Sequence, residues 1–272
     1  MAKTPAVGMV PPMNSGVRSF VSAGALALAL FSGCATVPET GRRQLMLLDA
    51  AQEAKMGLSA FAELKSQQPT SRDPGANARV RRIGARIAPA VGRDLPNADW
   101  EFVVFESAQV NAFALPGGKV GVYTGLLDFA DSDDELAAVI GHEIAHVSAR
   151  HGAERASQQL GVALLGAGVA VATEDAKHRD AIRVAYGLAA TGTVLKYSRD
   201  HESEADRIGL LYMARAGYDP AAAVRFWRKM AAREQSGPRM PEWLSTHPTD
   251  ATRIARLERW LPEMVPVYEA SR

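Results

Sequence analysis

The chain has 272 residues, of which 47% are hydrophobic and 22% are charged, and its formal net charge is +1. These values are typical of a globular protein with a sizeable core. They show no basic excess of the kind that nucleic-acid binding needs, so no nucleic-acid partner is expected. The sequence has no repeat of fixed period and no heptad run, which argues against a solenoid or a coiled coil.

The amino-terminal residues 1–33 have the layout of a secretory signal. Arg18 is followed by the apolar stretch "FVSAGALALALFSG", which is too short to span a bilayer comfortably. Cys34 comes next and is the only cysteine, which excludes an intramolecular disulfide. Its setting, "LFSGCATVP", resembles a bacterial lipobox. We therefore expect a lipoprotein signal peptide at 1–33 and a lipid anchor on Cys34; a plain cleaved signal is the alternative.

The residue after the cysteine bears on the compartment. Ala35 is not the aspartate that, by resemblance to bacterial lipoproteins, favours retention in the inner membrane. The expected location is thus the periplasmic side of the outer membrane. Residues 34–47 are polar and contain proline and glycine, as in a tether, so the domain itself is expected at 48–272.

Apolar spacing predicts helices over 47–68 and 77–92, separated by the turn sequence "PTSRDPG". Aromatic and β-branched residues predict a strand over 100–107. A Pro-Gly-Gly turn between two short extended pieces then predicts a hairpin over 111–125.

Ser132 and Glu135 match a capping box, and acidic residues fill the first turn, which predicts that a helix begins here and carries "GHEIAH". The apolar segments 160–172 and 181–195 are each too short to cross a membrane. They predict a helical hairpin packed on the core or partly inserted at a membrane surface. Further helices are expected over 201–218, after the cap at Asp219, and over 245–261 as a short final helix.

The segment "HEIAH" places two imidazoles on one face of its helix. His142 and His146 lie one turn apart, and Glu143 is rotated by about 100° towards a catalytic water. The apolar flanks argue against an exposed polar face, since buried histidines without partners would be costly. His151 lies five residues beyond His146, about 140° off the ligand face, and is not expected to bind the metal.

A catalytic zinc needs a third protein ligand, and the segment "YSRDHESEAD" offers one. Glu202 is the candidate ligand. Asp206, four residues later on the same face, is the candidate carboxylate that would hold a ligand imidazole. His201 and Glu204 point elsewhere on this helix and are expected to be surface residues.

These segments, together with "TGRRQL", "NAFALPGG" and "THPTDATRI", resemble the gluzincin metallopeptidases of the HtpX and CAAX prenyl protease type. The resemblance is greatest to their periplasmic lipoprotein branch, which includes BepA and LoiP. It implies an α+β, mostly helical, zincin-like domain with a small sheet or hairpin beside the HExxH helix, and one Zn²⁺ per chain. It assigns the zinc ligands to His142, His146 and Glu202, the catalytic glutamate to Glu143, and the supporting carboxylate to Asp206.

The sequence departs from this family in two places. The chain ends shortly after "THPTDATRI", without the helical-repeat domain of some relatives, so functions attributed to such repeats are not expected here. It also lacks the membrane spans of HtpX. By resemblance, His247 reaches the zinc site, where it either stabilises an oxyanion or occupies the open position as a fourth ligand. Arg253 is a further candidate for an oxyanion-stabilising or structural role.

We therefore expect a zinc endopeptidase that cleaves unfolded or misassembled envelope polypeptides, with Glu143 as general base for a metal-activated water. A zinc-bearing chaperone or scaffold for outer-membrane protein quality control, with little proteolysis, is the alternative. An extended substrate is expected to pair as an added strand with the hairpin at Asn111, Ala112 and Phe113; a purely structural hairpin is the alternative.

Overall fold

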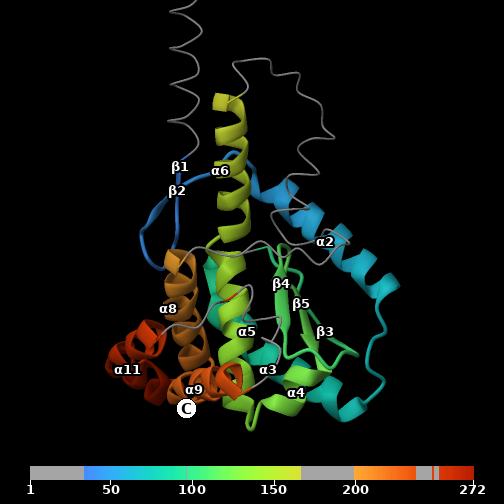
Figure 1. The fold of residues 1–272 in the computed structure, drawn as a ribbon, viewed down its shortest axis with the longest axis vertical. Coiled ribbons are helices and arrows are strands. Elements are labelled where there is room, and N and C mark those ends of the chain that lie inside the picture. The colour runs from blue at the N-terminus through green and yellow to red at the C-terminus, as the bar shows by residue number, and fades with distance from the viewer. Residues whose placement is uncertain (1–33, 96, 167–198, 237–246, 248–250) are drawn as a thin grey trace, which may run out of the picture.

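The computed structural model describes residues 34–95, 97–166, 199–236, 247 and 251–272 (Figure 1). The predicted signal peptide at 1–33 and most of the apolar segments 160–172 and 181–195 lie outside these residues. The described elements are β1 (Cys34–Thr36), β2 (Arg43–Leu45), α2 (Ala50–Gln67), α3 (Pro74–Val91), η1 (Gly92–Asp94), β3 (Glu101–Phe105), β4 (Ala112–Leu115), β5 (Lys119–Tyr123), α4 (Thr124–Phe129), α5 (Asp133–Ser148), α6 (His151–Gly166), α8 (Arg199–Arg215), α9 (Ala221–Ser236) and α11 (Ala251–Ala270).

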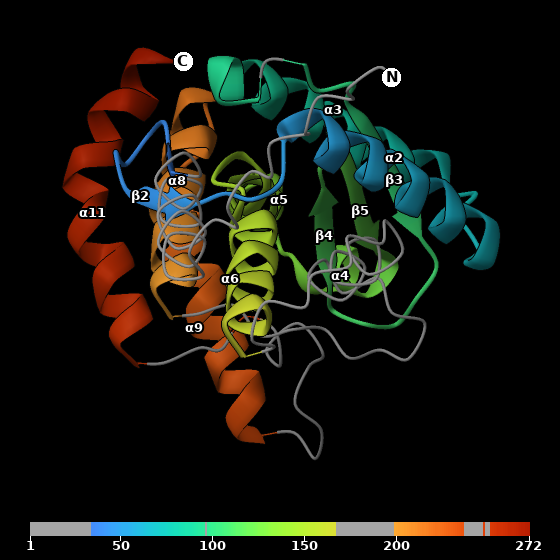
Figure 2. The same ribbon diagram turned by 90° about the horizontal axis from the view of Figure 1, so that it is seen from above.

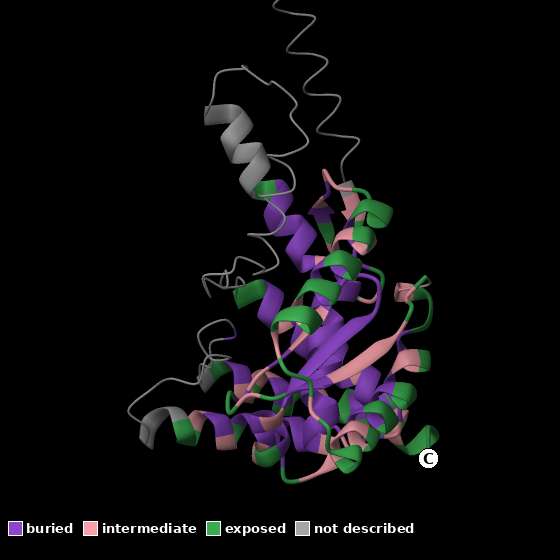
Figure 3. Cartoon of the chain, turned by 90° about the vertical axis from the view of Figure 1, so that its right-hand side faces the viewer, coloured by how far each residue is buried: buried purple, intermediate pink, exposed green. Residues whose placement is uncertain are grey.

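The fold is α+β and mostly helical, as expected. Helix α5, which carries "HEIAH", lies between the three-stranded sheet on one side and α8 on the other, with α9 and α11 beyond (Figures 1 and 2). Buried residues fill this centre, and exposed residues lie on the outer faces of the helices (Figure 3). The helix with the candidate metal ligands is therefore buried along nearly its whole length.

The predicted helix starts follow ordinary capping chemistry. The Asp49 carboxylate accepts hydrogen bonds from two backbone amides at the start of α2, and Asp73 caps α3, in which Pro74 takes the first position. At α5, the Ser132 hydroxyl accepts from the Glu135 amide at 3.2 Å. The Glu135 carboxylate reaches back to the amide of Asp131 at 3.0 Å, so the capping box is present with its return bond one residue earlier than usual.

The predicted strand and hairpin join into one mixed sheet with the order β3-β5-β4. Strands β4 and β5 pair antiparallel, which confirms the hairpin, whereas β3 pairs parallel with β5, which the sequence did not predict. Gly117 and Gly118 in the turn have φ of 89° and 85°, a region that favours glycine.

Alternating side chains give the sheet two packed faces. Val104, Val120 and Val122 belong to the main core with α3 and α5. Phe105 and Tyr123 belong to a smaller cluster with Phe61 of α2 on the opposite face. The sheet is therefore covered on both sides, and it holds α5 at a defined distance.

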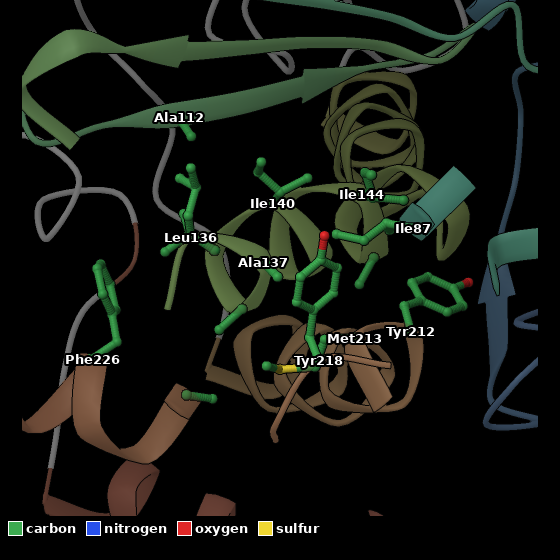
Figure 4. Packing of buried hydrophobic residues seen from close by; sticks show 14 of the residues in the cluster. Ile87, Ala112, Leu136, Ala137, Ile140, Ile144, Tyr212, Met213, Tyr218 and Phe226 are labelled. Carbon is green, nitrogen blue, oxygen red and sulfur yellow. The ribbon is translucent and has the colours of Figure 1, made fainter. Parts of the chain in front are cut away.

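Helices α5 and α8 approach closely at a pair of glycines. A β-carbon added to Gly209 would lie 2.8 Å from the backbone nitrogen of His142, and one added to Gly141 would lie 3.0 Å from the Gly209 carbonyl oxygen. Around this contact, Ile140 and Ile144 of α5 pack with Met213 of α8 in the core (Figure 4). The contact sets how close the histidines of α5 come to the carboxylates of α8.

The segment expected to be a tether is instead a folded hairpin. Strands β1 and β2 pair antiparallel, and Val37 and Met46 are buried. The backbone nitrogen of Leu47 donates to the Ser157 hydroxyl of α6 at 2.9 Å. The hairpin therefore rests against the domain, next to α6 and α8 (Figure 2). A polar composition alone did not predict this packing.

The final helix is longer than the predicted 245–261. Helix α11 runs from Ala251 to Ala270 and continues through Pro262 and Pro266, positions at which a helix often ends. Its residues Leu257 and Met264 are buried in the main core, and this packing offsets the missing backbone hydrogen bonds. Within the described part of the chain, no helix has the length and hydropathy needed to cross a bilayer.

Substitution of Gly209 by alanine should separate α5 from α8. The added methyl group has no space against the backbone of α5, so we expect a loss of about 1–3 kcal/mol in the free energy of unfolding. Urea denaturation followed by circular dichroism measures this loss. The control is Gly75→Ala in the first turn of α3, where the added atom meets only the Asp73 side chain and the change should stay within about 0.5 kcal/mol. Equal stability of both variants would contradict the proposed close contact.

Candidate metal centre

Four buried side chains converge where α5 faces α8. His142 and His146 extend from α5, Glu202 from α8, and His247 from the segment before α11; the exposed fraction of each is 2–4%. One potential ligand atom from each lies within 4.8 Å of all the others. The two helical motifs recognised in the sequence thus meet in space.

The separations match those between the ligands of one small cation. The Nε2 atoms of His142 and His146 are 3.1 Å apart, and they lie 3.5 and 3.4 Å from the two Glu202 oxygens. Zinc bonds of about 2.0–2.1 Å in a tetrahedron place neighbouring ligand atoms about 3.3 Å apart. Two imidazoles and a carboxylate are also the ligand types that zinc prefers. The residues therefore fit a zinc ion.

His247 occupies the remaining corner. Its Nδ1 lies 3.3 Å from the Nε2 of His142 and 2.9 Å from a Glu202 oxygen. The other ring nitrogen, Nε2, lies 3.6 Å from the carboxylate of Glu143. The imidazole of His247 thus lies between the other members of the group and Glu143, in the space that a nucleophilic water would need.

Asp206 lies behind His142, as the spacing on α8 predicts. Its carboxylate is 3.0 Å from the Nδ1 of His142, which leaves the Nε2 directed at the other ligand atoms. Burial lowers the pKa of His142, but the contacts with Asp206 and Glu202 outweigh burial and raise the pKa to about 9. Zinc binding at Nε2 would therefore displace a proton.

Arg253 has a structural place in the site. Its guanidinium, 1% exposed, donates two hydrogen bonds of 2.7 Å to Asp206, and its Nη1 lies 3.2 Å from Glu202. It also stacks over the Trp227 ring at 3.2 Å. Burial raises the pKa of Asp206, but Arg253 and His142 outweigh it and lower the pKa below its ordinary value, which keeps this carboxylate charged. The sequence did not predict a role for Trp227, because no local pattern shows that its ring meets Arg253.

His146 has a different partner. Its Nδ1 lies 2.9 Å from the Nδ1 of His151, and the Nε2 of His151 lies 2.9 Å from the carboxylate of Glu204. The ring of His201 stacks on that of His151 with centroids 4.4 Å apart. His151 is outside the four-residue group, but it contacts the group directly.

The prediction that His201 and Glu204 are surface residues is wrong. They are 6% and 8% exposed, because α6 and the N-terminal hairpin cover this face of α8. Helical periodicity within residues 201–218 could not reveal a cover supplied by residues 40–42.

The position of His151 has a specific backbone cause. Helix α5 ends at Ser148, and Arg150 adopts φ of 56°, the left-handed region. This turn redirects the chain so that His151, the first residue of α6, lies next to His146. The estimate of 140° between the two rings assumed a continuous helix. Arg150 is held in this conformation by a 2.7 Å ion pair with Glu53.

Strand β4 is an edge strand that packs on α5. The Asn111 carbonyl accepts from the amide of Tyr123, and Phe113 pairs with Gly121, so the backbones of Asn111 and Phe113 face β5. By alternation, the backbone of Ala112 faces the outer edge, where no strand of the described residues pairs with it. The structure thus leaves one of the three predicted substrate residues with an outward amide. The Phe113 ring packs with Phe105 and Tyr123 instead.

Comparison with known proteins gives consistent matches. The sequence profile of Peptidase family M48 matches residues 74–261. The chain is 35% identical over 238 residues to the mitochondrial metalloendopeptidase OMA1 of Schizosaccharomyces pombe, covering 86% of this chain and 68% of the relative. It is 32% identical to the human metalloendopeptidase OMA1, over 85% of this chain and 47% of the relative.

A bacterial relative is also similar. The chain is 29% identical over 263 residues to the beta-barrel assembly-enhancing protease of Escherichia coli, covering 91% of this chain and 52% of the relative. The chain thus spans about half the length of this relative and of the human one, and about two thirds of the fission yeast one.

Proposed function

The chain belongs to Peptidase family M48, whose members are zinc metalloendopeptidases, and we propose that it cleaves unfolded or misassembled polypeptides of a bacterial envelope. The observation that carries the proposal is the buried group of His142, His146 and Glu202, with Glu143 beside it. An intact glutamate next to the ligands favours an enzyme over a zinc-bearing scaffold, because holding a metal requires no general base.

We assign His142, His146 and Glu202 as the ligands of one Zn²⁺ and Glu143 as the general base. A bound zinc ion supplies Lewis-acid chemistry that activates a water molecule and polarises the scissile carbonyl group. The Glu143 carboxylate accepts a proton from the attacking water and returns it to the leaving amine. Asp206 and Arg253 keep the His142 ring oriented throughout.

Replacement of Glu143 by glutamine tests the assignment. The amide cannot accept the water's proton, so we expect kcat on casein to fall by about 10²–10⁴-fold while one zinc per chain remains. The measurements are casein degradation and zinc content by mass spectrometry. Glu63→Gln on the exposed face of α2 is the control and should change neither. Unchanged cleavage by the Glu143 variant would overturn the assignment. Binding of unfolded protein without cleavage by the unaltered chain would favour the scaffold.

We further propose that His247 silences the site in this conformation. Its Nδ1 completes the four-membered group, and its ring fills the space in front of Glu143. Of its two possible roles, a plug in the open position fits these contacts better than oxyanion stabilisation, which would require that position to be free for the substrate.

His247→Ala should therefore raise proteolysis by about tenfold, because it removes a state in which the site is closed. Initial rates of casein cleavage measure the effect, and zinc content serves as the control for an intact centre. A fall in rate with zinc retained would show instead that His247 assists the reaction.

We propose that substrate binds in extended form along β4. The outward amide of Ala112 is next to α5, and a peptide paired there would lie beside the helix that carries His142 and His146. This mode selects unfolded segments, because only an extended backbone can pair with a strand edge.

Ala112→Pro removes the outward amide without removing a β4–β5 hydrogen bond. We expect kcat/KM for casein to fall by about tenfold, the effect of one lost backbone hydrogen bond of about 1.4 kcal/mol. Ala112→Gly is the control, since it changes the side chain but keeps the backbone N–H that proline removes. Equal rates for the two variants, with equal zinc content and thermal stability, would show that the edge is not used.

We propose that the protein is a lipoprotein of the periplasmic branch of this family, anchored through Cys34 on the periplasmic side of the outer membrane. The lipobox-like "LFSGCATVP" supports the anchor, and Ala35 supports the outer membrane. The Escherichia coli relative has a name that refers to β-barrel assembly, which agrees with envelope substrates.

Mass spectrometry of the mature amino terminus in a bacterial host should find Cys34 carrying lipid. Cys34→Ser is the control and should move the protein from the membrane fraction to the soluble fraction. An unmodified cysteine, or any other first residue, would remove the anchor from the proposal.

A further inference from the structure

A polar network behind the metal centre, buried on α6 and α8 and partly exposed in the N-terminal hairpin, has no role in the reaction described above. It consists of Thr40 and Arg42 in the N-terminal hairpin, His151 and Glu154 on α6, and His201 and Glu204 on α8, and we refer to it as the Arg42 network. His151 is fully buried, and His201, Glu154 and Glu204 are at most 8% exposed. Burial of this many polar and charged groups is costly unless each is paired.

One line of contacts in the Arg42 network leads to a proposed zinc ligand. The Nδ1 of His146 is 2.9 Å from the Nδ1 of His151, whose Nε2 is 2.9 Å from Glu204. The Arg42 Nε donates to the same Glu204 oxygen at 2.7 Å, and the Thr40 hydroxyl donates to the other. The line therefore runs without interruption from the hairpin to His146.

The hydrogen bonds along this line can all be donated in one direction, from His146 towards Glu204. A His146 that binds zinc through Nε2 carries its proton on Nδ1 and donates it to the Nδ1 of His151. His151 then carries its own proton on Nε2 and donates it to Glu204. A charged Glu204 thus holds both rings in one tautomer and raises the basicity of His146.

Arg42 holds Glu204 in place from outside both helices. Besides its bond to Glu204 on α8, its Nη1 and Nη2 donate at 2.9 and 2.7 Å to the two oxygens of Glu154 on α6. The Nε2 of His201 also lies 3.0 Å from Glu154. One guanidinium therefore joins α6, α8 and the hairpin, and its planar shape suits this bidentate pairing.

We propose that Arg42 is a positioning residue for the metal centre: it fixes Glu204, which orients His146 through His151, so that tight zinc binding requires the N-terminal hairpin to be seated on α6 and α8. This inference rests on the proposed zinc site. It makes the hairpin, which begins at the proposed lipid attachment residue Cys34, a part of that site. Arg253 has the corresponding role at the other ligand imidazole, because it fixes Asp206 behind His142.

The test is the zinc affinity of the full chain, measured by competition with a chromophoric chelator of known affinity. We expect Arg42→Ala to weaken zinc binding by about 10-fold, the lower end of the effect of losing a direct partner of a ligand, because Arg42 acts through Glu204 and His151. Glu204→Gln should weaken it similarly, and Arg42→Lys should restore part of the loss. Arg43→Ala is the matched control: this neighbouring arginine lies in the same hairpin, is exposed, and should leave the affinity unchanged. Asp206→Asn is the positive control.

A double-mutant cycle separates positioning from general stabilisation. If Arg42 acts through His151, adding Arg42→Ala to His151→Ala should weaken zinc binding by less than about threefold more, whereas independent effects would multiply. Thermal unfolding in EDTA reports the stability of each variant without metal. An unchanged zinc affinity in Arg42→Ala, or multiplying effects in the cycle, would overturn the inference.

The outcome is distinct from a failure of the proposed function. If the unaltered chain holds no zinc, the metal centre itself is wrong. If the unaltered chain and Arg43→Ala bind zinc equally and Arg42→Ala does so as well, only the role of Arg42 is wrong.

Discussion

The close packing of α5 on α8 is the constraint on which the metal centre depends. Gly141 and Gly209 let the two helix backbones approach until no β-carbon fits between them. This brings His142 and His146 within bonding range of one ion together with Glu202, which lies 56 residues after His146 in the chain. Because the three groups sit on regular helix, their geometry is set by backbone packing and not by a loop, which is how a preorganised site is best supported.

Burial imposes a second requirement, that each ligand imidazole has a partner for its other ring nitrogen. The structure meets it in two different ways. His142 uses a carboxylate, Asp206, which Arg253 holds from the C-terminal helix. His146 uses a second imidazole, that of His151, within the Arg42 network. Elements from both ends of the described chain thereby meet at the centre.

The position of His247 among the candidate ligands determines whether the site is open or closed to a substrate. The Nδ1 of His247 lies 3.3 Å from the Nε2 of His142, a separation that suits a fourth ligand, and closure by four protein ligands is typical of structural rather than catalytic zinc. Glu143 lies beside the group, 3.6 Å from the Nε2 of His247, where a general base is expected. A site with the residues of an enzyme and the closure of a structural centre agrees with the proposed removable plug at His247.

The sequence by itself determined the local features: the helix start at Ser132, the hairpin, the spacing of His142 and His146, and Glu202 with Asp206 on one face. Each follows from a period of 3.6 residues or from capping and turn chemistry, which operate over a few positions. Only the tertiary structure decided that β3 pairs parallel with β5, that residues 34–45 pack on the domain, and that Glu204 and His201 are buried. The β3–β5 pairing joins strands 18 residues apart, and the hairpin contacts that cover α6 and α8 join segments more than 100 residues apart. The position of His151 depends on the left-handed backbone of Arg150. No local period could have shown these features.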